Sequence, residues 1–597
     1  MLLHTFKNMF IKSSVKAAIL IVSVSMIALQ GKAQGFLKAD GKKIVDEKGK
    51  NVLLRGMGLG GWMLQEGYML HVNKDSRQFR IRERLEELMG PAETKEFYDT
   101  WLANNTRKAD IDSMHRWGFN SVRLPMHYNL YTLPIEKEPV AGQNTWIDKG
   151  FQMTDALLAW CKANHMYLIL DLHATPGGQG NDLNISDRNT DNPSLWDSEA
   201  NKQKMIALWR KLADRYKNEP NIAGYDIINE PNWGFDDPEH DKNGLKEKTN
   251  APLRKLMIDI TAAIRQVDKK HIIIIEGNGW GNNYNGILPP WDKNMVLSFH
   301  KYWNFNDQQS IEHIIKTRDQ YNVPAWIGET GENSNTWLTE EIALLEKNNI
   351  GWALWPLKKM GNNNPIEIPS NLNYDDVTNY LNTGNHKPKE SNVYSGTLEL
   401  AIHAKIENAI IHHDVIDAIF RQPYTTATKP FKANKVTNGT IINAVDYDLG
   451  RNGYAYFDTD TADYHVSTGK YGKGNDGRVY RNDGVDISKD STAYNSYYVD
   501  HIETGEWLQY TLQVKTAGIY AVNLKVASAT DDAKLSLIVN GADQAKEVPA
   551  PYTGSPKTWK TITVKNIHLK AGSNKIRVYA NTGGYNLHSL QFWIAKK

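Results

Sequence analysis

The stretch Ile222-Ala-Gly-Tyr-Asp-Ile-Ile-Asn-Glu-Pro231 ends a short apolar run with a carboxylate, Glu230. A second stretch, Val323-Pro-Ala-Trp-Ile-Gly-Glu329, ends its own apolar run with Glu329. Both runs are short and apolar, which is typical of buried parallel strands rather than of helices. The sequence therefore predicts two parallel strands that each present a glutamate at the carboxyl end.

Six further apolar runs resemble these two, and amphipathic helical stretches such as 202–216 and 252–267 lie between most of them. The eight expected strands are 52–57, 121–124, 167–172, 224–228, 272–275, 295–299, 325–328 and 351–355. Strands that alternate with helices in this order predict an α/β fold, a (β/α)8 or TIM barrel. A helical stretch at 396–420 is expected to close the ring.

The domain organisation follows from changes in pattern along the 597 residues. The barrel domain is expected at 34–420, and the polar, aperiodic segment 421–433 is expected to be a linker. From 434 to 597, short alternating strands punctuated by Gly, Asn and Asp predict an all-β jelly-roll sandwich.

Residues 1–33 have the pattern of a secretory signal peptide. Lys7, Lys12 and Lys16 precede an apolar stretch, and Ala33 is a small residue suited to cleavage. The chain has a single cysteine, Cys161, so no intramolecular disulfide can form. An exported protein without disulfides indicates a bacterial source, and we expect it to be secreted or periplasmic.

The composition excludes several classes of partner. Hydrophobic residues make up 41% and charged residues 23%, as in ordinary soluble proteins. The net charge is only +2 and no long basic run occurs, so we expect neither nucleic acid nor an anionic membrane surface as a partner. After signal cleavage we expect no membrane attachment, and we expect a monomer.

Polar and aromatic side chains gather at the ends of the expected strands, where the active sites of TIM barrels lie. They are Arg123, His173, Asn229, Glu230, His300, Tyr302, Glu329 and Trp355. Each has a structural explanation when taken alone, such as a rim ion pair or a core histidine. Their convergence on one face, with two glutamates among them, predicts a catalytic site.

Two glutamates on one barrel face suit retaining glycoside hydrolysis, which uses one protonated acid and one ionised nucleophile. We expect Glu329 to be the nucleophile, because Arg123 and Tyr302 would favour its charged form. Glu230 is expected to hold a proton, since a neighbouring carboxylate raises its proton affinity.

The remaining strand-end residues are expected to bind the sugar. Asn229 is expected to donate to the 2-hydroxyl, His173 and His300 to orient other hydroxyls, and Trp355 to offer a flat apolar face to a pyranose. Glu332 lies past a strand end and is expected to be a solvated loop carboxylate.

At these residues the sequence resembles glycoside hydrolase family 5. The matching elements run in order from residue 50 to about 360: Arg123 in Asn120-Ser-Val-Arg-Leu-Pro125, Leu170-Asp-Leu-His173, Asn229-Glu230-Pro231, His300-Lys-Tyr302, Ile327-Gly-Glu329 and the strand with Trp355. The resemblance implies a retaining mechanism with Glu230 as acid/base and Glu329 as nucleophile. No catalytic cofactor or metal is expected.

The segment Arg55-Gly-Met-Gly-Leu-Gly-Gly-Trp-Met-Leu-Gln-Glu66 resembles the first-strand segment of exo-β-1,3-glucanases in that family. The resemblance implies that Glu66 holds the non-reducing glucose. It favours glucans over mannans as the substrate.

The C-terminal region, 438–597, resembles carbohydrate-binding module family 6 around Gly505-Glu-Trp-Leu-Gln-Tyr-Thr511. The resemblance implies a sugar clamp made by Tyr480, Trp559 and Asn586. Pro556 stands where the family has a further tryptophan, and Asn443 and Val445 stand where it has two calcium-binding glutamates. These departures put the module's structural calcium in question.

The sequence thus predicts a secreted β-glucan hydrolase, specific for β-1,4- or β-1,3-linked glucose, whose partner is a polysaccharide. Two alternatives stay open. One is a hydrolase of another β-linked polymer such as mannan, xylan or a xanthan-like glucan. The other is a non-catalytic glycan-binding protein with a degenerate barrel, against which the intact pair of glutamates argues.

Overall fold

The computed structural model describes residues 34–459, 479–491, 493 and 495–595. Phe36–Lys597 forms one compact unit. The predicted signal peptide at 1–33 lies outside the described residues. Among the residues that are described, no helix has the length and apolar character needed to cross a membrane.

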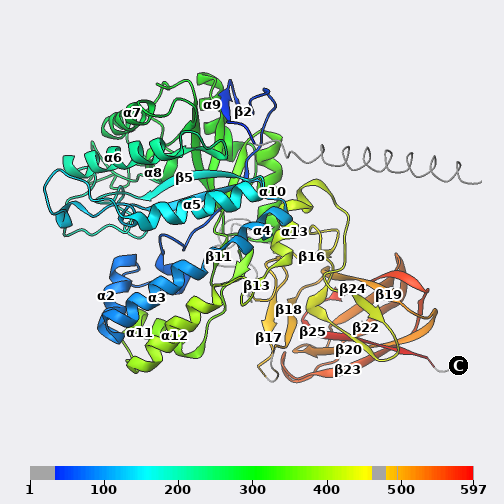
Figure 1. The fold of residues 1–597 in the computed structure, drawn as a ribbon. Coiled ribbons are helices and arrows are strands. Elements are labelled where there is room, and N and C mark those ends of the chain that lie inside the picture. The colour runs from blue at the N-terminus through cyan, green and yellow to red at the C-terminus, as the bar shows by residue number, and fades with distance from the viewer. Residues whose placement is uncertain (1–33, 460–478, 492, 494, 596–597) are drawn as a thin grey trace, which may run out of the picture. The chain divides into compact units, whose positions relative to one another are not determined.

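Eight parallel strands close into a barrel in the order β10-β3-β4-β5-β6-β7-β8-β9 (Figure 1). All eight expected strands are present, so the predicted TIM barrel is confirmed. Their bounds are β3 (Arg55–Gly58), β4 (Ser121–His127), β5 (Tyr167–Ala174), β6 (Ile222–Asp226), β7 (Ile272–Glu276), β8 (Met295–Lys301), β9 (Ala325–Gly331) and β10 (Gly351–Trp355).

Helices occupy the segments between the strands. They are α4 (Lys108–Trp117), α5 (Asp148–Ala163), α6 (Glu199–Tyr216), α7 (Ala251–Arg265), the short α8 (Asn278–Gly281), α9 (Glu312–Tyr321) and α10 (Asn335–Lys347). In α7, Leu253, Met257, Ile260 and Ile264 recur at helical spacing and are buried in the main core. Such one-sided apolar stripes cover the outside of the strands.

Four helices form a separate cluster with its own hydrophobic core. They are α2 (Gln78–Met89), α3 (Pro91–Asn104), α11 (Leu372–Thr383) and α12 (Glu390–His403). The expectation of one ring-closing stretch at 396–420 is therefore wrong in part. Residues up to His403 pack against α2 and α3. The chain returns to the barrel core at Ile406 and continues into α13 (His413–Phe420), where Phe420 meets Phe119 edge to face.

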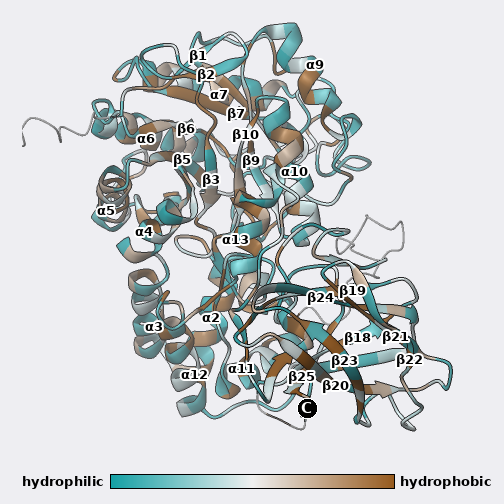
Figure 2. Ribbon diagram, turned by 90° about the vertical axis from the view of Figure 1, so that its right-hand side faces the viewer, coloured by the Kyte–Doolittle hydropathy of each residue, from teal (hydrophilic) through white to brown (hydrophobic). Residues whose placement is uncertain are grey.

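The C-terminal region is an all-β sandwich, as predicted, and its described residues form two six-stranded sheets. One sheet holds β14 (Asn434–Val436), β16 (Tyr456–Phe457), β19 (Trp507–Val514), β21 (Lys534–Val539), β22 (Ala542–Pro549) and β24 (Gly572–Thr582). The other holds β15 (Thr440–Asn443), β17 (Ile487–Lys489), β18 (Tyr497–Ile502), β20 (Gly518–Ser528), β23 (Lys560–Leu569) and β25 (Tyr585–Ile594). Strands β20 and β25 carry hydrophobic stretches that help to build the core between the sheets (Figure 2).

Five short strands of the described residues lie outside the barrel and the sandwich. They are β1 (Lys38–Asp40) and β2 (Lys43–Val45), which pair with each other, and β11 (Lys358–Lys359), β12 (Ile366–Glu367) and β13 (Ile410–Ile411), which form a small sheet after β10.

The segment expected to be a linker is held at several points. Arg421 and Lys429 both form ion pairs with the buried carboxylate of Asp417 on α13, and Lys429 pairs through its backbone with Leu449 in the sandwich. A segment bonded in this way has less conformational freedom than a flexible linker.

Candidate active site

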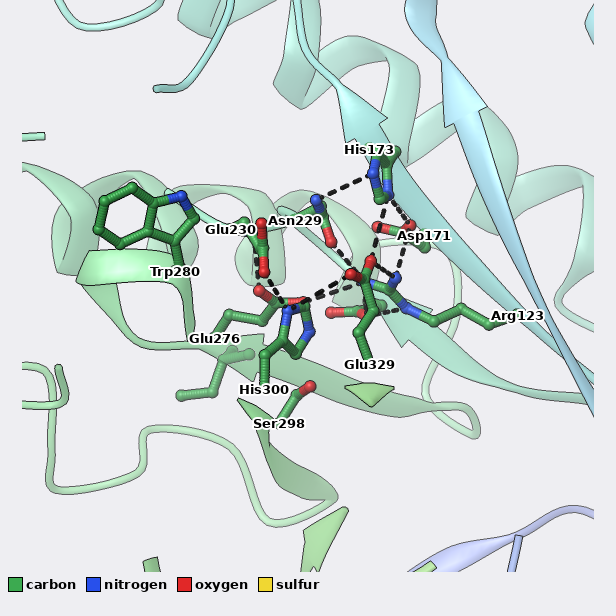
Figure 3. A network of polar contacts seen from close by, with 12 residues as sticks. Arg123, Asp171, His173, Asn229, Glu230, Glu276, Trp280, Ser298, His300 and Glu329 are labelled. Atoms are coloured by element: carbon green, nitrogen blue, oxygen red, sulfur yellow. Dashed lines mark hydrogen bonds and ion pairs between the residues drawn. The ribbon is translucent and has the colours of Figure 1, made fainter. Parts of the chain in front are cut away.

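Arg123 lies at the centre of the carboxyl end of the barrel, on β4, and is fully buried (Figure 3). Its guanidinium donates to Glu329 Oε1 at 2.5 Å, to Asn229 Oδ1 at 2.7 Å, and to Asp226 and Glu276 at 3.0 Å. A planar guanidinium, which has five N–H donors, fixes several side chains at once. Arg123 therefore sets the relative positions of side chains from strands β6, β7 and β9.

Glu329 lies within β9, and its two oxygens have different partners. Oε1 accepts from Arg123, and Oε2 accepts from the hydroxyl of Tyr302 at 2.9 Å. Burial and the charge of Glu329 raise the pKa of Tyr302 well above its ordinary value, so that phenol remains a donor at neutral pH. The carboxylate is thus oriented by one cation and one neutral donor.

Glu230 follows β6 and faces Glu329. One oxygen of each, together with a ring nitrogen of His300, lie within 4.8 Å of one another. Burial raises the pKa of Glu230 to about 7, although its hydrogen bond from His300 Nδ1, at 2.6 Å, opposes the shift. A carboxyl group with this pKa can exchange a proton near neutral pH.

The backbone at Glu230 is in the left-handed region, with φ of 40°. A non-glycine residue adopts this conformation only where its surroundings impose it. The amide nitrogen of Glu230 donates to Glu276 Oε2 at 2.7 Å, and Glu276 is itself held by Arg123 at 3.0 Å. Glu276, at the end of β7, therefore fixes the turn that aims Glu230 into the site.

The two histidines of the site differ in charge at neutral pH. His300 lies between Glu230, Glu276 and Glu329; burial would lower its pKa, but these carboxylates raise it well above its ordinary value. His173 is equally buried, and burial lowers its pKa to about 3. His300 is therefore a cation among carboxylates, and His173 is a neutral ring.

The tautomer of His173 follows from its partners. The amide Nδ2 of Asn229 can only donate, and it lies 3.2 Å from His173 Nε2. The proton is then on Nδ1, which donates to Asp171 Oδ2 at 2.8 Å. Asn229, bonded by Arg123 at one end and His173 at the other, is locked in orientation.

Trp355 forms a flat wall of the site. Its ring stacks on His173 at 5.0 Å between centroids with an angle of 5°, and its Nε1 donates to the hydroxyl of Tyr68 at 3.1 Å. Gly58 and Gly60 leave the space that the ring occupies, because a Cβ on either would lie 2.4 or 2.7 Å from the indole. Trp355 depends on both glycines.

We expect Gly58→Ala to displace Trp355, and thereby to lower kcat/KM by about tenfold or more, as small misplacements in active sites do. Steady-state kinetics with a soluble substrate measures this loss. Gly518→Ala is the matched control, since Gly518 has open space around its Cα position and an ordinary φ. Equal activity of the two variants would show that the ring does not need the space at Gly58.

A second group of polar residues adjoins Trp355. Glu66 Oε1 lies 3.9 Å from His173 Nε2, and burial, reinforced by Glu329 and Glu332, raises the pKa of Glu66 well above its ordinary value. Glu332 is hydrogen-bonded to Tyr68 and lies 3.5 Å from Lys359 Nζ, with 16% of its side chain exposed.

The expectation that Glu332 is a solvated loop carboxylate is therefore wrong. The chain turns back after β9, with φ of 129° at Gly331 and 49° at Glu332. This left-handed turn directs the carboxylate toward Tyr68 and Lys359 instead of toward solvent.

Sequence reasoning missed three carboxylates that support the site: Asp171, Asp226 and Glu276. All three are fully buried around Arg123. Burial raises the pKa of Asp171 to about 8 although Arg123 opposes the shift. In Glu276, burial acts in the same direction, but His300 and Arg123 outweigh it and lower the pKa. Their position in or at the end of barrel strands was the signal that could have found them.

Trp280 was also missed. It lies beside Glu230 in Figure 3, on the short α8, with a left-handed backbone at φ of 57°. Its Nε1 lies 3.4 Å from Asp182 Oδ2, and both residues line a polar surface hollow with Arg77 and Lys242. Trp280 is therefore shared between the surroundings of Glu230 and this hollow.

The residues expected to form one sugar clamp in the sandwich do not come together. Tyr480 packs against Tyr497 on the core side and bonds to Asp446, whereas Trp559 packs edge to face against Tyr498. Consecutive residues of β18 point to opposite faces. Tyr480 and Trp559 therefore lie on different faces of that sheet. Asn586 stays near Trp559, since its amide donates to Pro556 O at 2.9 Å.

With this geometry in place, comparison with known proteins identifies the barrel. Residues 84–361 match the family model described as cellulase, glycosyl hydrolase family 5. The barrel is a family 5 glycoside hydrolase domain. Family 5 is a retaining family, in agreement with the resemblance seen in the sequence.

Three relatives of this family 5 domain carry different enzyme names. A β-xylosidase of Phanerodontia chrysosporium is 26% identical over a region that spans 57% of this chain and 74% of the relative's length. Endoglucanase C of Acetivibrio thermocellus is 24% identical over 45% of this chain and 87% of its own length. A probable glucan 1,3-β-glucosidase A of Aspergillus niger is 26% identical over 52% of this chain and 69% of its own length.

Residues 481–594 match the model of carbohydrate binding module family 35, so the expected family 6 is wrong. The motif that suggested family 6 supplies buried core residues of β19, including Leu508 and Tyr510. Core residues of this kind report the sandwich fold, which unrelated binding modules share. The family 5 domain is thus followed by a carbohydrate-binding module of family 35.

Proposed function

We propose that the protein hydrolyses a β-linked glucan by double displacement, with Glu329 as nucleophile and Glu230 as acid and base. The carrying observation is the separation of the two glutamates, whose nearest oxygens lie within 4.8 Å. Retaining enzymes hold their carboxyl groups about 5–5.5 Å apart, whereas inverting enzymes leave about 6.5–9.5 Å for a water.

In the first step, Glu329 attacks the anomeric carbon while the proton of Glu230 passes to the leaving oxygen. A covalent glycosyl ester forms on Glu329 and the glycosidic bond breaks. In the second step, Glu230 takes a proton from water, which attacks the same carbon and releases Glu329 as a carboxylate. Arg123 and Tyr302 stabilise that carboxylate in both steps.

The walls of the site support a sugar chain that occupies both sides of the catalytic pair. Trp355 gives the glycone side an apolar face, and Glu66 lies beside it near the neutral His173. Trp280 and the polar hollow that it lines extend the acid side. Two aromatic side chains that follow β8, Trp303 and Phe305, are 55% and 53% exposed and offer further stacking surface.

Glucan is the substrate that the observations favour. An endoglucanase and a glucan 1,3-β-glucosidase are among the relatives, and Glu66, for which the sequence resemblance implies a glucose-binding role, lies 3.9 Å from His173. Xylan is the second candidate substrate, because one of the relatives is a β-xylosidase. Mannan and xanthan-like polymers have no comparable support.

We further propose that catalysis needs no metal ion, although Glu230, His300 and Glu329 could offer three ligand atoms to one. A metal ligand must be a neutral imidazole, and three carboxylates hold His300 in its cationic form. We also propose that the protein is exported, acts on polysaccharide outside the cytoplasm and works as a monomer.

A panel of polysaccharides tests the substrate assignment. Products from laminarin, lichenan, carboxymethylcellulose, xyloglucan, xanthan, xylan and mannan are separated and identified by mass spectrometry. A product series from one glucan is the expected result, and its sizes report endo or exo action. Turnover of xylan or mannan alone would overturn the glucan assignment and leave the double displacement intact.

A further inference from the structure

A loop of the sandwich is buried against the barrel. Arg481, Asn482 and Asp483 precede β17 and are 0–1% exposed. The backbone nitrogen of Asn482 donates to Asp414 Oδ2 at 2.7 Å, and its carbonyl accepts from the nitrogen of Asn335 at 2.8 Å. Both partners belong to barrel helices, α13 and α10. The loop is thus bonded to the barrel by its own backbone.

The side chains of the loop add to these bonds. Asn482 Nδ2 donates to Asn333 O at 2.7 Å, and Asn335 Nδ2 donates to Asp483 Oδ1 at 3.0 Å. Arg481 holds Asp483 in place through its Nε at 2.8 Å. A buried polar network with this many partners specifies one arrangement of its members.

The bonds continue from this loop to the nucleophile. Asn333, whose carbonyl accepts from Asn482, lies on the segment that directly follows β9 and Glu329. Its own Nδ2 donates to Tyr302 O at 3.4 Å, and the Tyr302 hydroxyl donates to Glu329 Oε2 at 2.9 Å. Asn482 is therefore connected to the carboxylate that attacks the sugar through three hydrogen bonds and two residues, Asn333 and Tyr302.

An independently tethered binding module would present this loop to solvent and keep its linker free. Instead, the loop is excluded from water, and Arg421 and Lys429 of the connecting segment are paired with Asp417. In a barrel without this loop, Asn333 O would lose its bond from Asn482, and the Asp414 carboxylate would keep its bond from Asn335 Nδ2 but lose the one from Asn482 N. The contact therefore completes the barrel.

We propose that the loop Arg481–Asp483 is a positioning element of the hydrolase site, which holds the segment after β9 and through it Tyr302 and Glu329. The module then contributes to the chemical step as well as to polymer binding. This inference rests on the proposed role of Glu329 as nucleophile.

The test compares two full-length variants. Asn482→Ala removes the bonds to Asn333 and Asn335. Asn574→Ala is the matched control, because Asn574 is equally buried and also bonds backbone carbonyls, Lys570 O and Gly572 O, but within the sandwich. The substrate is an activated aryl glycoside of the sugar identified in the panel, too small to reach the module's glycan-binding surface.

We expect Asn482→Ala to lose about tenfold to a hundredfold in kcat with little change in KM, as distant mutations that misplace a reacting group do. The rate of covalent labelling of Glu329 by the matching 2-deoxy-2-fluoro glycoside falls in parallel. Asn574→Ala keeps both rates, and both variants bind insoluble polymer as the parent does.

A folded Asn482→Ala protein with the parent's kcat and labelling rate would overturn the inference and leave a simple tether. Should Asn482→Ala not fold, Asn362→Ala, which removes only the bond to Arg481 O, is measured in the same way. A several-fold loss in its labelling rate supports the inference, and an unchanged rate overturns it. The proposed function fails separately, if Glu329→Gln remains active.

Discussion

Glu329→Gln lowers turnover of every substrate by about 10⁴-fold or more, because an amide cannot form the glycosyl ester on which double displacement depends. The substitution keeps the shape of the side chain: the amide oxygen still accepts from Arg123, and the amide nitrogen, in place of Oε2, donates to the hydroxyl oxygen of Tyr302. We therefore expect the fold and the polymer affinity to persist. Initial rates on the best substrate of the panel measure the loss.

Thermal unfolding and polymer co-sedimentation serve as controls for this variant. A cooperative transition near that of the parent, together with unchanged binding, assigns the loss to chemistry. If the amide variant instead retained more than a few per cent of the parent's rate, another group would have to be the nucleophile.

Glu230→Ala separates substrates by their leaving groups. Cleavage of natural polysaccharide needs the proton of Glu230, so kcat/KM for polysaccharide falls by about 10²–10⁴-fold. In an aryl glycoside with an acidic phenol, the phenolate leaves without that proton, so kcat/KM for this substrate stays near the parent value. Azide, a nucleophile that needs no base, restores turnover by releasing the glycosyl ester as a glycosyl azide.

The pH profile gives the same residue a second test. Burial raises the pKa of Glu230 to about 7, and the first step needs the protonated form. Parent activity on polysaccharide therefore falls as the pH rises through about 7. In Glu230→Ala, kcat/KM for the activated aryl glycoside loses this alkaline limb. Equal losses on both substrate types, or an alkaline limb that persists, would contradict the acid role.

Much of the site could be predicted because it lies where strands end. Arg123, Asn229, Glu230, His300 and Glu329 all follow or close short apolar runs, and parallel strands in one barrel bring their carboxyl ends to one face. Glu276 follows the same rule, since it directly succeeds four isoleucines. The prediction did not include it because the expected strand, 272–275, ends one residue before this carboxylate.

Other features depend on information that local patterns do not contain. The side chain of Glu332 points inward because of a left-handed turn. Gly331 permits this turn, but a glycine in the sequence does not by itself predict it. The positions of Tyr480 and Trp559 depend on which face of β18 each packs against. The burial of Asn482 depends on contacts with residues far away in the chain, such as Asn333.

The four-helix cluster has a consequence for the order in which the protein can be made. Helices α2 and α3 are translated before most of the barrel, but their core is completed by α11 and α12, and Asn104 donates to Ala401 O. The first strand, β3, likewise waits for β10 to close the ring. The amino-terminal quarter of the chain therefore leaves the ribosome with exposed apolar faces that stay uncovered until residues near 400 have been synthesised. Chaperones that bind such faces have their longest opportunity on this segment.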